Sequence, residues 1–483
     1  MPFYESGGVY WNFIIIIPLC LIFLNVLKYI SKRLIFNQHR KSPSPVLMKN
    51  YELAKDSNLL EYIEEFQKAG YVSKFINSKS DFVLGKDNLH LFNGLPENVF
   101  SSIIVSKKVF HKSWTSLNHF ESGLYNVNLA PILYKNISRL MQKFEYVIHE
   151  NINKDIELFL QNDHVFIENI SEYVSEILID FAIWLCYGDS SKKDPEFLYS
   201  IMLLLGKEAS FCEKNIGNVL KFRKSNPERA RDYLKDFVLK GKFRKINENI
   251  MDENNCLVKF ILENQNQLGF SDNVYDISLP DHLYLFVTLL GHSLSNFLID
   301  ISLDPRAFRN LEIEQKNLIS KYGRVIKTEY LDEMAYLDAA IAESSRLSRD
   351  GVSMKEALSD IFLQNGVMIP KGALAKFNIL TYTRCPEIFL EEPHSYIPER
   401  HFRLGTKLGL PSKYNIMWGL ARQCPYAKHC SNFMKLFVAT IIRSYEISQG
   451  YSENANRHDG YFFENLVQHA KTSLYLKRRD IST

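Results

Sequence analysis

The sequence has no long Gly/Ser-rich linker and no low-complexity block between residue 51 and its end. Its composition therefore gives no sign of a domain boundary in this stretch. The chain has 483 residues, of which 46% are hydrophobic, and such a chain can bury a large core. We therefore predict one large domain over residues 51–483, larger than most single domains.

The chain also lacks an excess of charge of one sign. It carries 58 basic and 55 acidic residues, a formal net charge of +3. This balance argues against nucleic acid as a partner, because a protein that binds nucleic acid concentrates positive charge. The seven cysteines are odd in number and lack paired spacing, which excludes a disulfide framework and fits the reducing cytosol.

Residues 9–26 form an almost wholly apolar run near the N-terminus. If Lys28 extends its amine to the interface, about 20 residues are available to cross a bilayer. No Lys or Arg precedes the run, and five follow it: Lys28, Lys32, Arg33, Arg40 and Lys41. The positive-inside rule then places the N-terminus in the lumen and the rest in the cytosol. A cleaved signal peptide is the alternative, but it requires a basic region before the apolar run.

These features predict three regions. Residues 1–30 form the lumenal N-terminus and a transmembrane anchor. Residues 31–50 form a basic hinge, which Pro43 and Pro45 stiffen. Residues 51–483 form the catalytic domain.

Helical periodicity dominates that domain, with apolar residues three and four apart over much of residues 51–268. Leu279-Pro280-Asp281 predicts the start of a helix, because proline suits a first turn. Residues 282–301 are apolar nearly all round, so this helix is buried, and its several polar side chains make a lipid environment costly. Residues 360–372 predict a hairpin with an Asn-Gly turn. The fold class is mainly α with a small β part.

Cys424 is the candidate for chemistry in this chain. It precedes Pro425 and then an apolar helical run over residues 433–442, so it lies where a loop meets a helix N-terminus. The positive end of a helix favours a thiolate, which is a soft ligand for iron. A buried structural thiol is the alternative, and it is the commoner role of a single cysteine.

Three other segments accompany Cys424. Glu343-Ser344-Ser345-Arg346 is an E-x-x-R sequence on a predicted helix, Arg400 follows within residues 396–402, and Arg422 stands two residues before the cysteine. In this order the four segments resemble the cytochrome P450 family of haem-thiolate monooxygenases, and the resemblance runs over essentially the whole chain. It implies the cytochrome P450 fold, preceded here by one N-terminal transmembrane helix.

The resemblance assigns roles to the residues of the haem loop. Cys424 would be the fifth ligand of the iron of haem b (heme, iron-protoporphyrin IX), and Arg422 would pair with a haem propionate. Trp418 and Gly419 stand near the positions of an aromatic residue and a glycine. Two other positions depart from the family pattern, since Leu420 and Tyr426 replace glycines. These replacements imply a distorted loop or a displaced haem, because glycine allows close backbone approach.

The resemblance makes Glu343, Arg346 and Arg400 a buried structural network that fixes the loop carrying Cys424. A surface ion pair is the alternative for an isolated E-x-x-R sequence. His401 is inserted after Arg400 relative to the family pattern, which changes the packing expected there. The family's W-x-x-x-R contact to a propionate cannot be carried over, because Trp114 is followed by Asn118 where the arginine is expected.

On the central helix, Gly291, His292 and Ser293 occupy the family's small, acidic-or-histidine and hydroxyl positions. A hydroxyl beside the iron can relay protons to bound dioxygen, so Ser293 is a candidate catalytic residue. His292 can donate and accept protons near neutral pH and is the second candidate. A serine hydrogen bonded back to its own helix is the alternative.

The resulting prediction is a single-pass protein of the endoplasmic reticulum membrane with a cytosolic monooxygenase domain. The resemblance implies that O2 is the co-substrate and that NADPH supplies electrons through a separate NADPH-cytochrome P450 reductase. No G-x-G-x-x-G sequence follows a predicted strand, which agrees with a separate reductase. The substrate would be an apolar small molecule.

The predicted hairpin, the Cys424-Pro425 pair and the basic ending Lys477-Arg478-Arg479 resemble those of filamentous-fungal members that oxidise terpenoids, so we expect a sesquiterpenoid or diterpenoid of secondary metabolism. A polyketide is the alternative substrate. Two alternative functions remain: a haem-dependent isomerase or dehydratase, which needs no reductase, and a haem-free, membrane-anchored interaction protein derived from the family.

Overall fold

The computed structural model covers much of the chain beyond residue 58. It describes residues 23, 24, 26, 46–48, 59–69, 72–75, 82–109, 128–154, 164–207, 227–247, 256–349, 353–420, 423–449, 461–463, 467–469 and 472–479. The predicted hairpin and central helix therefore lie within the described residues. Trp114, Asn118, Arg422 and nearly all of the predicted anchor lie outside them.

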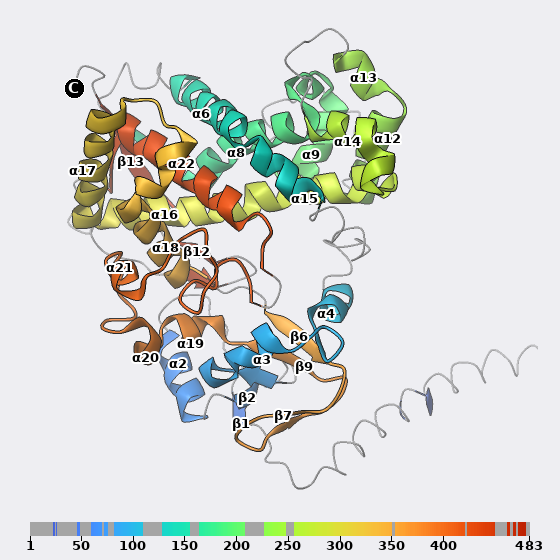
Figure 1. The fold of residues 1–483 in the computed structure, drawn as a ribbon, viewed down its shortest axis with the longest axis vertical. Helices are drawn as coiled ribbons and strands as arrows, with labels where there is room; N and C mark the ends of the chain where they lie inside the picture. The colour runs from blue at the N-terminus through green and yellow to red at the C-terminus, as the bar shows by residue number, and fades with distance from the viewer. Residues whose placement is uncertain are drawn as a thin grey trace, which may run out of the picture.

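The described elements form a helical part and a smaller part that contains the largest sheet, above and below the long central helix in Figure 1. The mainly helical fold with a small β part is thus confirmed. The helices in chain order are α2 (Leu59–Lys68), α3 (Leu89–Gly94), α4 (Ser102–Val109), α6 (Ile137–Lys154), α8 (Ile170–Tyr187), α9 (Pro195–Leu204), α12 (Pro227–Leu239), α13 (Lys242–Asn247), α14 (Leu257–Leu268), α15 (Leu279–Leu285), α16 (Gly291–Leu303), α17 (Pro305–Tyr322), α18 (Ala335–Leu347), α19 (Ile379–Thr383), α20 (Pro386–Phe389), α21 (Arg400–Leu404) and α22 (Ala427–Ser444). Short 3-10 and π segments are η2 (Lys86–Asn88), η3 (Asp189–Lys193), η5 (Val274–Ser278), η6 (Phe286–Leu290) and η7 (Thr328–Glu333).

The strands form small sheets. They are β1 (Val46–Met48), β2 (Val72–Phe75), β3 (Phe82–Leu84), β4 (Phe100–Ser101), β5 (His164–Ile167), β6 (Met354–Ala357), β7 (Ile361–Phe362), β8 (Met368–Ile369), β9 (Leu374–Phe377), β10 (Tyr445–Ser448), β11 (Tyr461–Phe463), β12 (Val467–His469) and β13 (Leu474–Arg478). The largest sheet has the order β1-β2-β3-β9-β6-β4, and a second has the order β10-β13-β5.

Two strand assignments bear on the sequence predictions. The predicted hairpin is present, since β7 and β8 pair antiparallel, and Gly366 takes the left-handed φ of 82° that its turn requires. Strand β1 pairs in parallel with β2 although it belongs to the predicted hinge. The sheet therefore extends to the N-terminal side of the predicted domain boundary at residue 51.

The central helix runs without interruption from Val274 to Leu303 through η5, α15, η6 and α16, and it runs across the upper half of Figure 1. The predicted start at Leu279-Pro280-Asp281 is confirmed as the start of α15, with Pro280 in its first turn, but the π turn η5 precedes it, so the continuous helix begins five residues earlier, at Val274. A second π turn, η6, widens the helix where it passes the cavity described below. Gly291 follows this turn and packs on α8, where an added Cβ would lie 3.4 Å from Leu178 Cδ1.

This helix is the one in the described part of the chain that is long and apolar enough to cross a membrane. However, 72% of its most apolar window is buried inside the protein, which indicates a core helix. Of the predicted N-terminal anchor, the structure describes Phe23, Leu24 and Val26, which are helical and exposed. The anchor itself stays a prediction.

Candidate functional site

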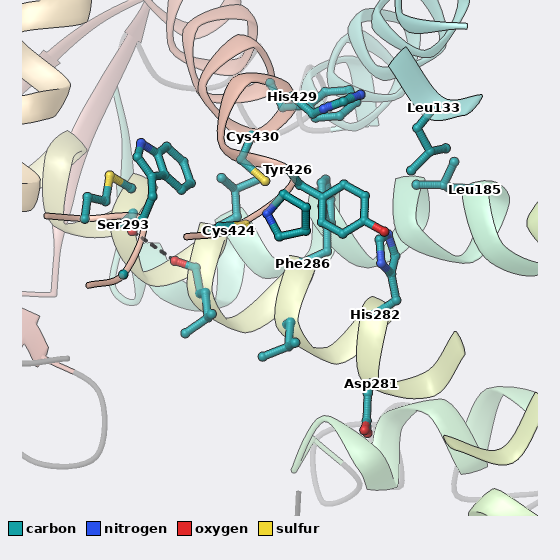
Figure 2. A pocket seen from close by; sticks show the side chains of 18 of the residues that line it. Leu133, Leu185, Asp281, His282, Phe286, Ser293, Cys424, Tyr426, His429 and Cys430 are labelled. Carbon is teal, nitrogen blue, oxygen red and sulfur yellow. Dashed lines mark hydrogen bonds between the residues drawn. The ribbon is translucent and has the colours of Figure 1, made fainter. Parts of the chain in front are cut away.

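A cavity of about 380 Å³ lies between the central helix and the N-terminal turns of α22 (Figure 2). Its walls are mostly apolar, and the sulfur-bearing residue Cys424 lines it together with Cys430. The side chains that surround it come from distant parts of the sequence: Leu133, Leu140, Leu185, Leu285, Phe286, Leu289, Leu290, Ser293, Met417, Trp418 and Phe433, among others. The cavity is thus an apolar chamber with two thiols in its wall.

Cys424 lies three residues before the first residue of α22. Its backbone N–H donates to the Trp418 carbonyl at 2.7 Å, which closes the loop, and its sulfur accepts a hydrogen bond from the Tyr426 N–H. Burial nevertheless raises the pKa of the Cys424 thiol, and this effect exceeds the lowering by the Tyr426 N–H and the Arg349 charge. The prediction that the helix terminus alone would favour a thiolate is therefore wrong. A cation bound at the sulfur would be needed to deprotonate it.

The conformation of the loop before Cys424 shows how Leu420 is accommodated at one of the two positions where the family pattern has glycine. Gly419 has a φ of 100°, a conformation that favours glycine, and it lines the cavity one position before Leu420. Leu420 is buried in the core cluster that includes Ile416 and Phe389, so its side chain does not line the cavity. Trp418 does line it, and its indole Nε1–H donates to the Leu408 carbonyl at 2.5 Å. The replacement of glycine by Leu420 therefore leaves the cavity open.

Tyr426, in contrast, replaces a glycine at a position where its side chain enters the cavity. Figure 2 shows its ring directed toward His282, with ring centroids 5.2 Å apart, and His429 lies 6.0 Å away on its other side. Neither the Tyr426 hydroxyl nor the ring nitrogens of His429 have a hydrogen-bond partner among the described residues. Burial, with a smaller contribution from His429, lowers the pKa of His282 to about 4, so this ring is neutral near neutral pH.

Arg349 is a cavity residue that the sequence analysis missed. It follows α18 by two residues and lines the cavity near Cys424. Burial lowers the pKa of its guanidinium to about 10, although the Cys424 charge acts in the opposite direction. No ion pair or hydrogen bond joins Arg349 to another residue in the part of the chain that the structure describes. In the sequence, the one feature that could have drawn attention to Arg349 was its position three residues after Arg346.

The two candidate catalytic residues on the central helix differ in position. Ser293 lines the cavity, but its Oγ–H donates to the Leu289 carbonyl at 3.0 Å, as in the alternative considered for an isolated serine (Figure 2). His292 does not line the cavity, and its Nδ1 lies 2.7 Å from the Thr288 carbonyl oxygen. Burial lowers the pKa of His292. Of the two residues, Ser293 is therefore the better placed to act on a molecule bound in the cavity.

The predicted structural network is buried and more extensive than the sequence suggested. The Glu343 carboxylate accepts hydrogen bonds from Arg346 at 2.7 and 2.8 Å and from Arg400 at 2.8 Å. His401, the inserted residue, adds its Nε2 at 2.9 Å from Glu343 Oε2. Burial alone would raise the pKa of Glu343, but Arg346 and the other donors together hold it well below its usual value.

The remaining guanidinium donors of this network tie down the chain before α21. Arg400 donates to the carbonyl oxygens of Phe389, Glu391 and Glu392, and Arg346 donates to those of Thr383 and Pro393. Glu343 and Arg400 are fully buried, so these hydrogen bonds are shielded from water. The network fixes the backbone that leads toward the loop of Cys424.

A haem requires a soft donor for iron, an apolar slot for the porphyrin and partners for its carboxylates. The cavity offers Cys424 as the donor, the apolar side chains of two facing helices as the slot, and Arg349 as a half-buried cation. The orphaned polar atoms of Tyr426 and His429 also indicate that a ligand belongs in the cavity, because buried polar atoms are normally hydrogen bonded. The residues therefore fit an iron porphyrin, which must be accommodated beside the Tyr426 ring.

Comparisons with known proteins agree with this geometry. The sequence model of the family described as cytochrome P450 matches residues 170–472, more than half of the chain. The computed structure is similar to that of retinoic acid bound cyanobacterial CYP120A1, with a TM-score of 0.66, 16% sequence identity and coverage of 91% of this chain and all of that one. At this identity the likeness concerns the fold alone.

The curated relatives are distant. Cytochrome P450 monooxygenase 71 of Postia placenta is 26% identical over 199 residues, which cover 39% of this chain and 39% of that protein. The putative cytochrome P450 520B1 of Dictyostelium discoideum is 22% identical over 77% of this chain and 78% of its own length. The chain thus spans well under half the length of the first of these relatives.

Proposed function

The chain belongs to the cytochrome P450 family, and on this premise we propose that it is a haem-thiolate monooxygenase that inserts one oxygen atom of O2 into an apolar small molecule. The main support for this proposal is the Cys424 thiol, which lies in the wall of an apolar cavity between the central helix and α22. A bound haem with a thiolate ligand supplies the reduction of dioxygen and the transfer of one oxygen atom.

The chain's own residues divide the remaining tasks. Cys424 Sγ would ligate the iron, and the Arg349 guanidinium would hold a propionate. Arg422 is a further propionate partner by resemblance, but it lies outside the described residues. Phe286, Leu289 and Phe433 exclude water and bind apolar substrate surface. Ser293 Oγ would hold and pass a proton toward the cavity once it exchanges its hydrogen bond with Leu289 for one with the ligand.

The experiment that tests the proposal is a spectrum of the reduced protein with CO, followed by turnover with and without O2 and NADPH in the presence of NADPH-cytochrome P450 reductase. We expect a thiolate-type Soret band and product only when both co-substrates are present. Product without O2 would establish the haem-dependent isomerase or dehydratase instead. Absence of haem binding would establish the interaction protein.

Ser293→Ala should keep haem binding and NADPH consumption but release more peroxide, because the central-helix hydroxyl proposed to deliver protons is lost. We expect the ratio of product formed to NADPH consumed to fall by about one to two orders of magnitude. Ser295→Ala is the matched control, since Ser295 also donates to a carbonyl of its own helix, Gly291 at 2.7 Å, but does not line the cavity. Equal coupling in both variants would place the proton path elsewhere, and the additional His292→Ala change tests whether histidine compensates.

Arg349→Gln should weaken haem retention by about ten- to a hundredfold, because a hydrogen bond to a charged group contributes about 1.5–3 kcal/mol. Haem transfer to apomyoglobin measures this loss without reference to turnover. Arg349→Lys keeps the charge and should recover part of the affinity. Equal haem retention in the wild type and Arg349→Gln would show that Arg349 holds no carboxylate of the haem.

For the substrate we propose a sesquiterpenoid or diterpenoid of fungal secondary metabolism. The support is the apolar lining of the cavity and the likeness of the chain to fungal monooxygenases of this family. Incubation with a panel of terpenoid and polyketide intermediates, read by the spin-state shift of the haem and by mass spectrometry, tests the class. A response to polyketides alone would overturn the terpenoid proposal.

We also propose a single transmembrane anchor that places the catalytic domain on the cytosolic face of the endoplasmic reticulum. The support is the apolar run over residues 9–26 and the basic residues that follow it. Deleting residues 1–40 should release part of the protein from membranes and leave haem binding intact, as cell fractionation and the CO spectrum can measure. A soluble truncated protein without haem would contradict a separable anchor.

A further inference from the structure

A second cavity, of about 810 Å³, lies at the other end of α22 from Cys424. The 18 residues of α22 separate the two ends by about 27 Å at 1.5 Å per residue. This second cavity lies among α6, α17, the last turn of α22 and the strands β10 and β13. Unlike the first cavity, it is lined mainly by polar and charged side chains.

Two buried hydrogen-bond donors in its wall have no acceptor among the residues that the structure describes. Arg443 Nε donates to Gln315 Oε1 at 2.9 Å, and Arg443 Nη1 donates to the Arg324 carbonyl at 2.7 Å. Arg443 Nη2 and Gln315 Nε2 are buried without a hydrogen-bond partner in the described part of the chain. Gln315 is only 2% exposed, so water reaches its amide poorly. Adjacent orphaned donors of this kind call for an acceptor bound in the cavity.

The charges around the cavity favour an anion. Six cationic side chains and three carboxylates line it. Two of the carboxylates, Glu312 and Glu446, already pair with Arg479. Lys477 and Arg478 form no ion pair within 4.0 Å among the described residues. The cavity therefore retains positive charge that its own carboxylates do not neutralise.

Glu145 is the third carboxylate that lines the cavity, and it is the side chain that could compete with a bound anion for Arg443. No ion pair of 4.0 Å or less joins it to Arg443 among the described residues, and it accepts a hydrogen bond from the Ile326 N–H. Burial raises the pKa of Glu145, so its charged form is disfavoured where it lies. It leaves the Nη2 donor of Arg443 available.

We propose that this second cavity binds a small phosphate-bearing anion, held by Arg443 and Gln315 and surrounded by the lysine and arginine side chains of β13. A phosphate group supplies up to two negative charges and several acceptor oxygens, which match a guanidinium beside an amide donor. A single water would satisfy the donors but would leave the excess positive charge and most of the volume unused. The proposal does not depend on the haem chemistry at the other end of α22.

The test is isothermal titration of the full-length, haem-loaded protein with pyrophosphate, with sodium chloride at equal ionic strength as the baseline. A parallel titration uses dioctanoyl phosphatidic acid, and dioctanoyl phosphatidylcholine is its control. Binding of pyrophosphate assigns a soluble ligand, and binding of phosphatidic acid alone assigns a lipid headgroup. The absence of both above their baselines overturns the proposal.

Two variants locate the binding. Arg443→Gln should weaken it at least tenfold, because a charge-assisted hydrogen bond is lost. Gln315→Glu should abolish it in a folded protein, because the new carboxylate pairs with Arg443 and repels the anion. Arg403→Gln, at a half-exposed arginine on α21 outside this cavity, is the matched control and should bind as the wild type does. Unchanged affinity in Gln315→Glu would overturn the proposed site even if Arg443→Gln fails to fold.

Discussion

Replacing Cys424 with alanine should remove the thiolate-type Soret band completely and should prevent stable haem incorporation. Cys424 is placed at the closed end of the loop by its hydrogen bond to Trp418, and it lines the cavity beside the helix that would face the haem. The spectrum of the reduced protein with CO measures this loss. A normal spectrum in the variant would show that the axial ligand is a different residue.

Cys430 is the matched control, because it is the other cysteine among the described residues that line this cavity. It lies one turn into α22, and its N–H donates to the Tyr426 carbonyl as part of the helix. Cys430→Ala should therefore keep the thiolate-type band. If the band survives in Cys424→Ala but disappears in the double variant, Cys430 is able to take over as the ligand.

Glu343→Gln should lower the free energy of unfolding by about 3–5 kcal/mol, because it leaves Arg346 and Arg400 buried without their carboxylate. This loss is a large fraction of the stability of a typical domain, so we expect much less haem-loaded protein. Urea unfolding followed by tryptophan fluorescence measures the change. Glu333→Gln is the matched control, since Glu333 pairs with Lys321 at the exposed surface, and it should unfold like the wild type.

The same carboxylate gives a pH test. The pKa of Glu343 in the folded protein lies well below its ordinary value of 4.5, so its contribution is fully present above that value and is lost as the pH falls below it. The difference in stability between the wild type and Glu343→Gln should therefore shrink as the pH is lowered from neutral to below about 4.5. A difference that stays constant over this range would mean that Glu343 is not stabilised as a carboxylate.

The order of Glu343, Arg346, Arg400 and Cys424 along the sequence was sufficient to predict the family and the helical fold, because these residues act at fixed places in the chain. The hairpin at Gly366 was also predictable, since an Asn-Gly pair determines its own turn locally. The start of α15 at Leu279 was predictable because proline suits a first turn, whereas the π turn before it, which begins the continuous helix at Val274, had no local signal in the sequence.

Which residues line the cavity also depended on tertiary contacts. The sequence identified Leu420 and Tyr426 as departures of equal weight, but packing separates them: Leu420 turns into the core, while Tyr426 projects into the cavity. Arg349 became a candidate ligand-binding residue only when the fold placed it beside Cys424. Helical periodicity indicates which face of a helix is apolar, but it does not tell which distant segment packs there.

Residue types and their spacing were sufficient to predict the family and the mainly helical class, and they made Cys424 the candidate ligand for iron. Packing across the chain was needed to show that His401 joins the Glu343 network, that Ser293 rather than His292 lines the cavity, and that burial raises the pKa of Cys424. The physical reason is that burial, unpaired donors and electrostatic fields arise from atoms brought together across the chain, and local sequence does not contain those distances.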